Sequence, residues 1–277
     1  MALQSRIAQA DNGAIGFDTT VPLNSATANS YFSQNFRFCI RYVSRNDAGR
    51  QSNARGGTAD LAADETAAIM RSGLALMVVQ HVAKPPWSPT SALGNTYGQN
   101  AATYAAQGGL LPGVVVWLDL EGVAEGTDHQ DIVDYCNEWF AAVTVAGYVP
   151  GVYIGYDVWL TEDELFFDLK TQHYWRADGN IPDVSHRGYQ IFQSIKNPNT
   201  PAEFDRDVIK LDDLDGLPIW MVARTVARKP LAGDPRHRRC SLSSITTIAK
   251  RGGEFVEVDY QEPARELLAE SVDLGAV

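Results

Sequence analysis

VVVWLDLEG, residues 114–122, is an apolar strand that ends in two carboxylates one residue apart and a closing glycine. Because side chains alternate along a strand, Asp119 and Glu121 are expected to point the same way. A run this apolar is typical of a strand buried on both faces, as in a parallel sheet, so both acids emerge at its carboxyl end. α/β proteins place their chemistry at that edge. The two acids also fit a role at the start of a following helix, and the segment alone leaves both interpretations open.

Two like charges this close raise the pKa of one partner, which predicts a neutral acid beside an ionised base. Cleavage of a glycosidic bond uses that pairing. The functional interpretation of the segment is therefore sugar chemistry.

The composition predicts a globular protein with a large core. The chain has 277 residues, of which 45% are hydrophobic and 21% charged, a length that suits one barrel or two ordinary domains. A net charge of -11 argues against nucleic acid or an anionic membrane as a partner. The sequence has no apolar run of membrane-spanning length and no standard secretory signal at its start. We expect synthesis in the cytoplasm, which is compatible with release by lysis or a specialised secretion system.

The cysteines and histidines do not suggest a metal site. Cys39, Cys136 and Cys240 lie far apart and without metal-ligand spacing. An odd number makes a poor disulfide framework, so we expect reduced and mostly buried thiols. The five histidines also lack metal-binding spacing. We therefore expect neither a metal nor a cofactor, with Ca²⁺ or Mg²⁺ bound by an acid cluster as the open alternative.

Short apolar strands alternate with amphipathic helices in the first part of the chain. Strands are predicted over residues 14–18, 36–44, 74–82, 114–120 and 149–156, and helices over 62–72, 96–107, 128–146 and 162–169. Three further strands, over 173–177, 188–195 and 204–211, are joined by loops rich in Pro, Asn and Gly. The pattern predicts a TIM-barrel-like (β/α)8 barrel of (β/α)5β3 type, whose last three repeats lack long helices.

The composition shifts after residue 218, which indicates a boundary. The segment contains a candidate strand over 219–226, a basic loop over 230–239, a candidate hairpin over 244–260 and a tail of helical propensity over 263–270. We predict a barrel over residues 1–218 and a small appendage over 219–277, where a protein partner would dock.

In a barrel, the functional side chains gather at the carboxyl ends of the strands. Acids, aromatic rings and amides dominate those ends here. This mixture suits a sugar, because carboxylates supply acid and base, rings stack on pyranose faces and amides bind hydroxyls. The predicted rim residues are Asp18, Arg41, Tyr42, Gln80, His81, Asp119, Glu121, Tyr153, Tyr156, Trp175, Arg176, Gln190, Gln193, Asp205 and Asp207.

Some of these residues also have plainer interpretations. Tyr153 and Trp175 suit ordinary packing. Asp18 suits a helix cap. Asp205 and Asp207 suit surface ion pairs.

Four motifs resemble the family 25 glycoside hydrolases, lysozyme-type enzymes that cut bacterial peptidoglycan. They are Gly16-Phe17-Asp18, WLDLE at 117–121, YQIFQ at 189–193 and FDRD at 204–207. The segments GFDT at 16–19 and IRYV at 40–43, with the Asp-Leu-Glu strand, more closely resemble bacterial glycoside-hydrolase-like domains of unknown function. The resemblance covers about residues 13–215 and implies the same barrel.

The resemblance implies a role for each acid. Glu121 matches the general acid, and Asp119 the carboxylate that stabilises positive charge. Asp18 and Asp205 match flanking acids that orient the substrate. Among the predicted rim residues, those that we expect to bind substrate are Arg41, Tyr42, Gln80, Tyr153, Trp175, Gln190 and Asp207.

The sequence departs from the family 25 pattern at two positions. Asp207 stands where Asn is frequent, and Tyr189 where Trp is common. Both departures alter the charge or the stacking surface of the site. The resemblance thus implies a peptidoglycan-cleaving muramidase, with two alternatives. One is a non-catalytic glycan-binding or structural module of a phage or secretion particle, and the other is a hydrolase of a different polysaccharide.

Overall fold

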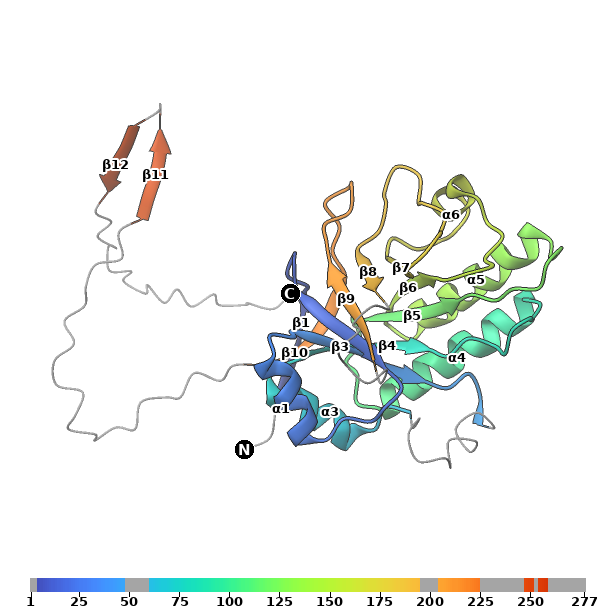
Figure 1. Ribbon diagram of the computed structural model, residues 1–277, viewed down its shortest axis with the longest axis horizontal. Helices are drawn as coiled ribbons and strands as arrows, with labels where there is room; N and C mark the ends of the chain where they lie inside the picture. Colours follow the sequence, from blue (N-terminus) through green and yellow to red (C-terminus); the bar gives the residue numbers. More distant parts are fainter. Residues whose placement is uncertain (1–3, 48–59, 195–203, 225–246, 252–253, 259–277) are drawn as a thin grey trace, which may run out of the picture. The chain divides into compact units, whose positions relative to one another are not determined.

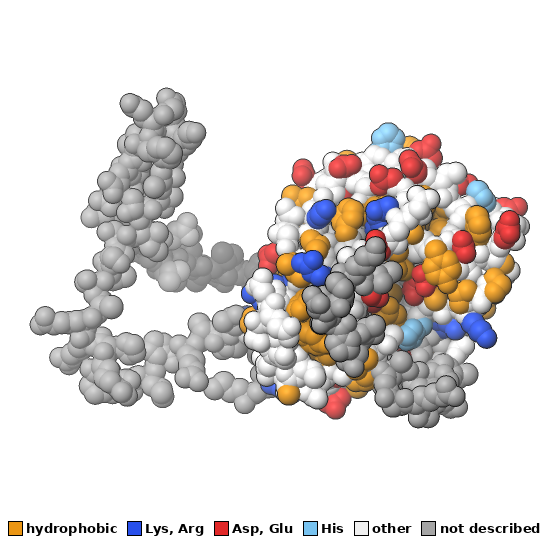
Figure 2. All heavy atoms as spheres, viewed as in Figure 1, with side chains coloured by type: hydrophobic (Ala, Val, Ile, Leu, Met, Phe, Trp, Pro, Cys, Tyr) orange, Lys and Arg blue, Asp and Glu red, His pale blue; other side chains and the backbone are white. Residues whose placement is uncertain are grey.

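The computed structural model describes residues 4–47, 60–194, 204–224, 247–251 and 254–258 (Figure 1). The chain divides into two compact units, Met1–Thr225 and Val226–Val277. Acidic side chains are more frequent than basic ones on the face of the first unit that Figure 2 shows, in keeping with the net charge of -11. None of the helices in the described part of the chain has the length and apolar character of a membrane span.

Eight strands of the first unit form a closed barrel. The strands β2 to β8 pair in parallel and in chain order, and β9 pairs antiparallel with both β8 and β2. The predicted barrel is thereby confirmed, with the last strand reversed. The strands are β2 (Ile15–Thr19), β3 (Phe38–Val43), β4 (Ala75–Gln80), β5 (Val115–Leu120), β6 (Val149–Ile154), β7 (Tyr174–Arg176), β8 (Ile191–Ser194) and β9 (Asp205–Ile209).

A helix follows each of the first five barrel strands, whereas the described residues between β7, β8 and β9 contain none. The sequence pattern located the last four of these helices, but it did not locate α1. In α1 only Ala28 is buried, so the apolar periodicity is weak, and its clearest signal is a capping box between Asn24 and Thr27. The helices are α1 (Ser25–Ser33), α3 (Ala63–Ser72), α4 (Ser91–Gln107), α5 (His129–Val145) and α6 (Glu162–Phe167).

Helices α4 and α5 lie side by side on one flank of the barrel (Figure 1). Gly94 and Gly98 of α4 allow this close approach. A Cβ on Gly94 would overlap the backbone of Tyr135, and one on Gly98 would lie 2.6 Å from the Trp139 carbonyl oxygen. These two buried glycines therefore allow α5, the helix that follows β5, to pack closely against α4.

Two more strands extend the barrel sheet. β1 (Ser5–Gln9) pairs antiparallel with β10 (Ile219–Ala223), and β10 pairs with β4 where Met221 meets Leu76. β10 belongs with the barrel because Trp220 and Met221 are buried, and the Trp220 ring lies 5.9 Å from that of Phe38. The first unit thus extends past the predicted boundary at residue 218.

In the second unit, β11 (Thr247–Arg251) and β12 (Glu254–Val258) form an antiparallel hairpin, as the sequence pattern predicted. The predicted basic loop over 230–239, the tail over 263–270 and Cys240 lie outside the described residues. Cys39 and Cys136 are buried free thiols.

Large rings fill the barrel below the rim, and glycines make room for them. A Cβ on Gly16 would overlap the Phe38 ring, and one on Gly151 would lie 2.5 Å from the Trp117 ring. The rings of Trp117 and Trp175 pack edge to face with centroids 5.9 Å apart. Because this packing fills the interior, the polar inner residues are confined to one rim of the barrel.

Candidate active site

Strand register brings acids from β2 and β9 to one rim. Asp18 near the end of β2 is the register partner of Asp205 at the start of β9, and Gly16 is the partner of Asp207. Asp207 is also the partner of Gln193 on β8. Since β9 runs antiparallel to its neighbours, its amino end lies at the rim where the other strands have their carboxyl ends. Asp205 and Asp207 therefore reach the predicted rim from the opposite end of their strand to the one expected.

The pair from β5 joins this rim from the other side of the barrel. Asp119 is the register partner of Tyr153 on β6, which in turn is the partner of Trp175 on β7. The Tyr153 hydroxyl donates to Gln193 Oε1, and Gln193 Nε2 donates to Asp18 Oδ2. These bonds link the Asp119 side of the rim to Asp18.

Asp18 accepts more side-chain hydrogen bonds than the other acids of the cluster. Its Oδ1 accepts a hydrogen bond from the Tyr42 hydroxyl at 3.0 Å, and its Oδ2 accepts one from Gln193 Nε2 at 2.8 Å. The Tyr153 hydroxyl donates to Gln193 Oε1 at 2.8 Å and so fixes that amide. Burial raises the pKa of Asp18 to about 7, although the bond from Gln193 acts in the opposite direction. Tyr42, Tyr153 and Gln193 thus hold this acid in place.

Asp207 lies completely buried beneath Asp18. Its Oδ1 accepts from the Trp175 indole N–H at 3.0 Å, whereas its Oδ2 is buried without a hydrogen-bond partner among the described residues. Burial and then the Asp18 charge raise the pKa of Asp207 well above its ordinary value. Asp205 is only partly buried, and burial raises its pKa as well. The predicted stacking residue Trp175 therefore supports Asp207 from below instead of facing the opening.

Asp119 lies deeper than Glu121. Asp119 is 7% exposed, and its Oδ2 accepts from the Val82 backbone N–H at 3.3 Å. Burial and then the Glu121 charge raise the pKa of Asp119 well above its ordinary value, and burial also raises that of the half-buried Glu121. Burial of the two acids therefore favours a proton on this pair in the free protein. The two groups titrate as a pair.

Glu121 is positioned by two neighbouring loops. Its backbone carbonyl accepts from the Trp87 indole N–H at 2.8 Å. Its side chain packs on Gly155, where a Cβ would lie 2.5 Å from the Glu121 Cβ. No sequence pattern indicated this role of Trp87, because the residue lies in the loop between β4 and α4. His81, the other predicted residue of this region, stacks on Tyr42 with ring centroids 4.5 Å apart.

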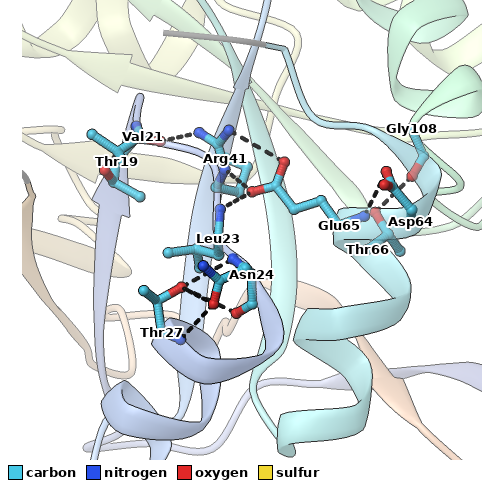
Figure 3. Close-up of polar contacts among 10 residues, drawn as sticks. All are labelled: Thr19, Val21, Leu23, Asn24, Thr27, Arg41, Asp64, Glu65, Thr66 and Gly108. Carbon is cyan, nitrogen blue, oxygen red and sulfur yellow. Dashed lines mark hydrogen bonds and ion pairs between the residues drawn. The ribbon is translucent and has the colours of Figure 1, made fainter. Parts of the chain in front are cut away.

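Arg41 does not belong to the site, contrary to the prediction. It points out of the barrel wall, where its Nε lies 2.6 Å from Glu65 Oε1 on α3 and its guanidinium also donates to the Thr19 carbonyl (Figure 3). The reason is strand alternation, since Arg41 precedes the inward-facing Tyr42. Arg176 likewise follows an inward residue and donates to carbonyls of its own loop.

Gln80 and Gln190 also lie away from the acids, contrary to the prediction. Gln80 packs between the barrel and its helices, where it accepts from Trp139 Nε1 at 2.7 Å and donates to the Tyr97 carbonyl at 2.8 Å. Gln190 precedes β8 and donates to Asp212 Oδ2 at 2.7 Å, at the opposite end of the strand from the rim. Both amides therefore have structural roles. In the described part of the chain, no group of three or more His, Cys, Asp or Glu side chains is arranged to hold a metal ion.

A sequence comparison finds a relative that matches part of this chain. The uncharacterized protein Rv0525 of Mycobacterium tuberculosis is 40% identical over 48 residues, which are 17% of this chain and 24% of that protein. The chain thus aligns with about a quarter of that relative.

Among solved structures, the Tat-secreted protein Rv2525c of Mycobacterium tuberculosis matches with a TM-score of 0.55 and 15% identity, over 72% of this chain and 96% of that one. The spore cortex lytic enzyme SleM of Clostridium perfringens matches with a TM-score of 0.50 and 13% identity, over 73% of this chain and 69% of that one. At these identities the likeness concerns the fold alone.

The sequence model of one family covers most of the barrel. The family is described as the Rv2525c-like, glycoside hydrolase-like domain, and its model matches residues 30–215. The match includes Asp119, Glu121, Asp205 and Asp207 and begins after Asp18. Because it spans more than half of the chain, this protein belongs to the family of Rv2525c-like, glycoside hydrolase-like domains.

Proposed function

We propose that this protein is a glycosidase that cleaves the sugar backbone of peptidoglycan. The observation that carries the proposal is the convergence of Asp18, Asp119, Glu121 and Asp205 at one rim of the barrel, with Tyr153 and Gln193 between them. Carboxyl groups in neutral and ionised forms beside hydroxyl and amide groups fit a sugar and its cleavage. The fold shared with a spore cortex lytic enzyme supports peptidoglycan as the substrate class.

In the proposed reaction, Glu121 donates a proton to the glycosidic oxygen as the bond opens. Asp119 carries the negative charge that stabilises the oxocarbenium-like sugar or a ring formed with the substrate's N-acetyl group. In the free protein, burial favours the proton on Asp119. Positive charge that develops on the sugar beside Asp119 favours its ionised form, so the proton of the pair belongs on Glu121 during the reaction.

The place of action follows from the substrate. Peptidoglycan lies outside the cytoplasm, and Rv2525c, which shares this fold, is Tat-secreted. We therefore propose that the protein leaves the cytoplasm, by lysis or by a secretion system.

One observation favours a second candidate, a glycan-binding module without turnover. Burial keeps Asp119 at the rim toward its neutral form, and a neutral carboxyl group can both donate hydrogen bonds to sugar hydroxyls and accept them. Such a module would bind peptidoglycan tightly and release no reducing ends.

The experiment that separates the two is an assay of reducing ends released from purified peptidoglycan by the full chain. We expect Glu121→Gln to lower turnover by at least ~10²-fold, because it removes the general acid. Asp119→Asn should have an effect of similar order. Glu138→Gln, on the exposed face of α5, is the matched control and should leave turnover unchanged.

Unchanged release by Glu121→Gln would refute its role as the acid. Tight binding of peptidoglycan by the wild-type chain without release of reducing ends would favour the binding module.

A further inference from the structure

Two large aromatic residues next to Glu121 are exposed, and the proposed reaction leaves them without a role. Tyr156 is 50% exposed and Trp159 is 40% exposed. Both lie in the loop that follows β6, and Tyr156 was among the rim residues expected from the sequence. Because exposed aromatic rings beside a polar site are typical of binding surfaces, this loop is a candidate for contact with the substrate.

The loop is held firmly against the end of β5. The Gly155 backbone N–H donates to the Leu120 carbonyl at 2.9 Å, and the N–H groups of Gly122 and Val123 donate to carbonyls of the β6 loop at 2.8 Å and 3.0 Å. Val158 and Leu160 are buried and anchor the loop from below. The exposed rings therefore stand on a fixed support that is continuous with Glu121.

Trp159 has a backbone conformation that is uncommon for a bulky residue. Its φ is +59°, in the left-handed region. Such a conformation persists where the surroundings hold it, and here the Trp159 indole N–H donates to the Val123 carbonyl at 2.8 Å. The indole is thus tied to the residue two positions after Glu121 while much of Trp159 stays exposed.

Tyr156 lies close to the acid pair. A Cβ on Gly122 would lie 3.3 Å from the Tyr156 hydroxyl. Partial burial raises the pKa of Tyr156, and the charges of Glu121 and Asp119 act on it in the same direction. The phenol ring therefore lies by the end of β5, on the Glu121 side of the cluster.

We propose that Tyr156 and Trp159 form a binding platform for the sugar on the leaving-group side of the scissile bond. This inference rests on the proposed function, because the position of the leaving sugar is deduced from the role of Glu121 as the general acid. A general acid must lie beside the leaving oxygen, so the leaving sugar occupies the Glu121 side of the cluster. The ligand class is an N-acetylated pyranose of a polysaccharide chain, whose apolar face packs on aromatic rings.

The test measures binding by the full chain carrying Glu121→Gln, which prevents turnover. The probes are chitotetraose, a soluble tetramer of N-acetylglucosamine, and insoluble peptidoglycan. We expect Tyr156→Ala and Trp159→Ala each to weaken binding by about two- to tenfold, the effect of losing one aromatic contact. Tyr156→Phe keeps the ring and should bind within about twofold of the parent.

The matched control is Phe167→Ala. Phe167 of α6 is 64% exposed and packs against Phe166 and His186. Its truncation should leave binding unchanged. Thermal unfolding of each variant checks that the barrel is intact.

The outcomes separate this inference from the proposed function. Binding that is insensitive to both ring truncations, absent in the parent, or weakened equally by Phe167→Ala would overturn the platform. Ring-dependent binding by a chain that releases no reducing ends in its wild-type form would support the platform and overturn the enzymatic function. In an active enzyme, we expect the ring variants to raise KM more than they lower kcat.

Discussion

The Trp175 indole N–H donates to Asp207 Oδ1 at 3.0 Å at the base of the acid cluster. The other oxygen of this fully buried carboxyl, Oδ2, has no hydrogen-bond partner among the described residues. Burial and then the Asp18 charge raise the pKa of Asp207 well above its ordinary value, because a buried charge without a partner is costly. We infer that Asp207 is neutral in the folded protein.

Replacing Asp207 with Asn should preserve this arrangement. The Asp207→Asn side chain is neutral as well and keeps an oxygen that accepts from Trp175, so we expect a change of less than about 1 kcal/mol in the free energy of unfolding. Asp207→Leu leaves the Trp175 N–H without its acceptor and should cost about 1–3 kcal/mol. Urea unfolding at neutral pH measures both. Equal destabilisation by Asn and Leu would show that the bond from Trp175 to a neutral group at position 207 has no role.

Stability should fall with rising pH through Asp18. Its pKa is about 7 in the folded protein against an ordinary value of 3.8. The folded state thus binds this proton more tightly than the unfolded state, and the stabilisation present at low pH is lost as pH rises from about 4 to about 7. The slope is up to about 1.4 kcal/mol per pH unit for one group.

The measurement for this prediction is the difference between wild type and Asp18→Asn in urea unfolding across that range. A difference is needed because His81, whose pKa burial lowers to about 4, acts with the opposite sign. Its neutral form is favoured in the folded state, so its contribution is lost as pH falls below about 6.5. A difference between the two proteins that does not vary with pH would contradict the prediction.

Gly155→Ala should impair catalysis more than stability. The added Cβ would lie 2.5 Å from the Cβ of Glu121, which forces the proposed acid to move. A displacement of about 1 Å at a reacting group costs on the order of 10²-fold in rate. We expect kcat to fall by that order, as measured with peptidoglycan. Gly151→Ala provides the contrast, because its Cβ would meet the Trp117 ring and lower the free energy of unfolding instead. Full activity in Gly155→Ala would argue against the position assigned to Glu121.

Arg41→Met tests whether Arg41 is structural. Arg41 and Glu65 are both buried, and Glu65 also accepts from the Leu23 backbone N–H at 2.7 Å. Removing one partner of a buried ion pair costs about 3–5 kcal/mol, whereas replacing both with apolar residues costs much less. We therefore expect Arg41→Met to be strongly destabilised and the double variant with Glu65→Leu to recover much of the loss. A stable Arg41→Met that fails to bind glycan would restore the substrate-binding role.

Apolar runs and loop composition were enough to predict the eight barrel strands, and two-residue spacing correctly paired Asp119 with Glu121. The same rule limits the site, since adjacent residues such as Arg41 and Tyr42 cannot both face the interior. Sequence alone does not say which member of such a pair faces inward. That choice depends on tertiary packing, here on Glu65 of α3, which draws Arg41 outward.

The direction of β9 and the presence of the weakly patterned strand β1 also could not be predicted from the sequence. Asp205 and Asp207 were expected at a carboxyl end, but β9 is antiparallel and presents its amino end. β1 has no buried residue, so its pattern carries no core signal. The difference in burial between Asp119 and Glu121 depends on the loops around Val82 and Gly155.

The pairing of β1 with β10 brings the two chain ends of the barrel unit together. Ser5 is the register partner of Ala223, and the Arg224 N–H donates to the Gln4 carbonyl at 2.7 Å. A unit whose ends meet in this way can be inserted into a surface loop of a host protein or circularly permuted with a short linker. The barrel unit can thus be transferred to another protein as one piece. Its joining points lie on β1 and β10, outside the eight-stranded barrel that carries the acids.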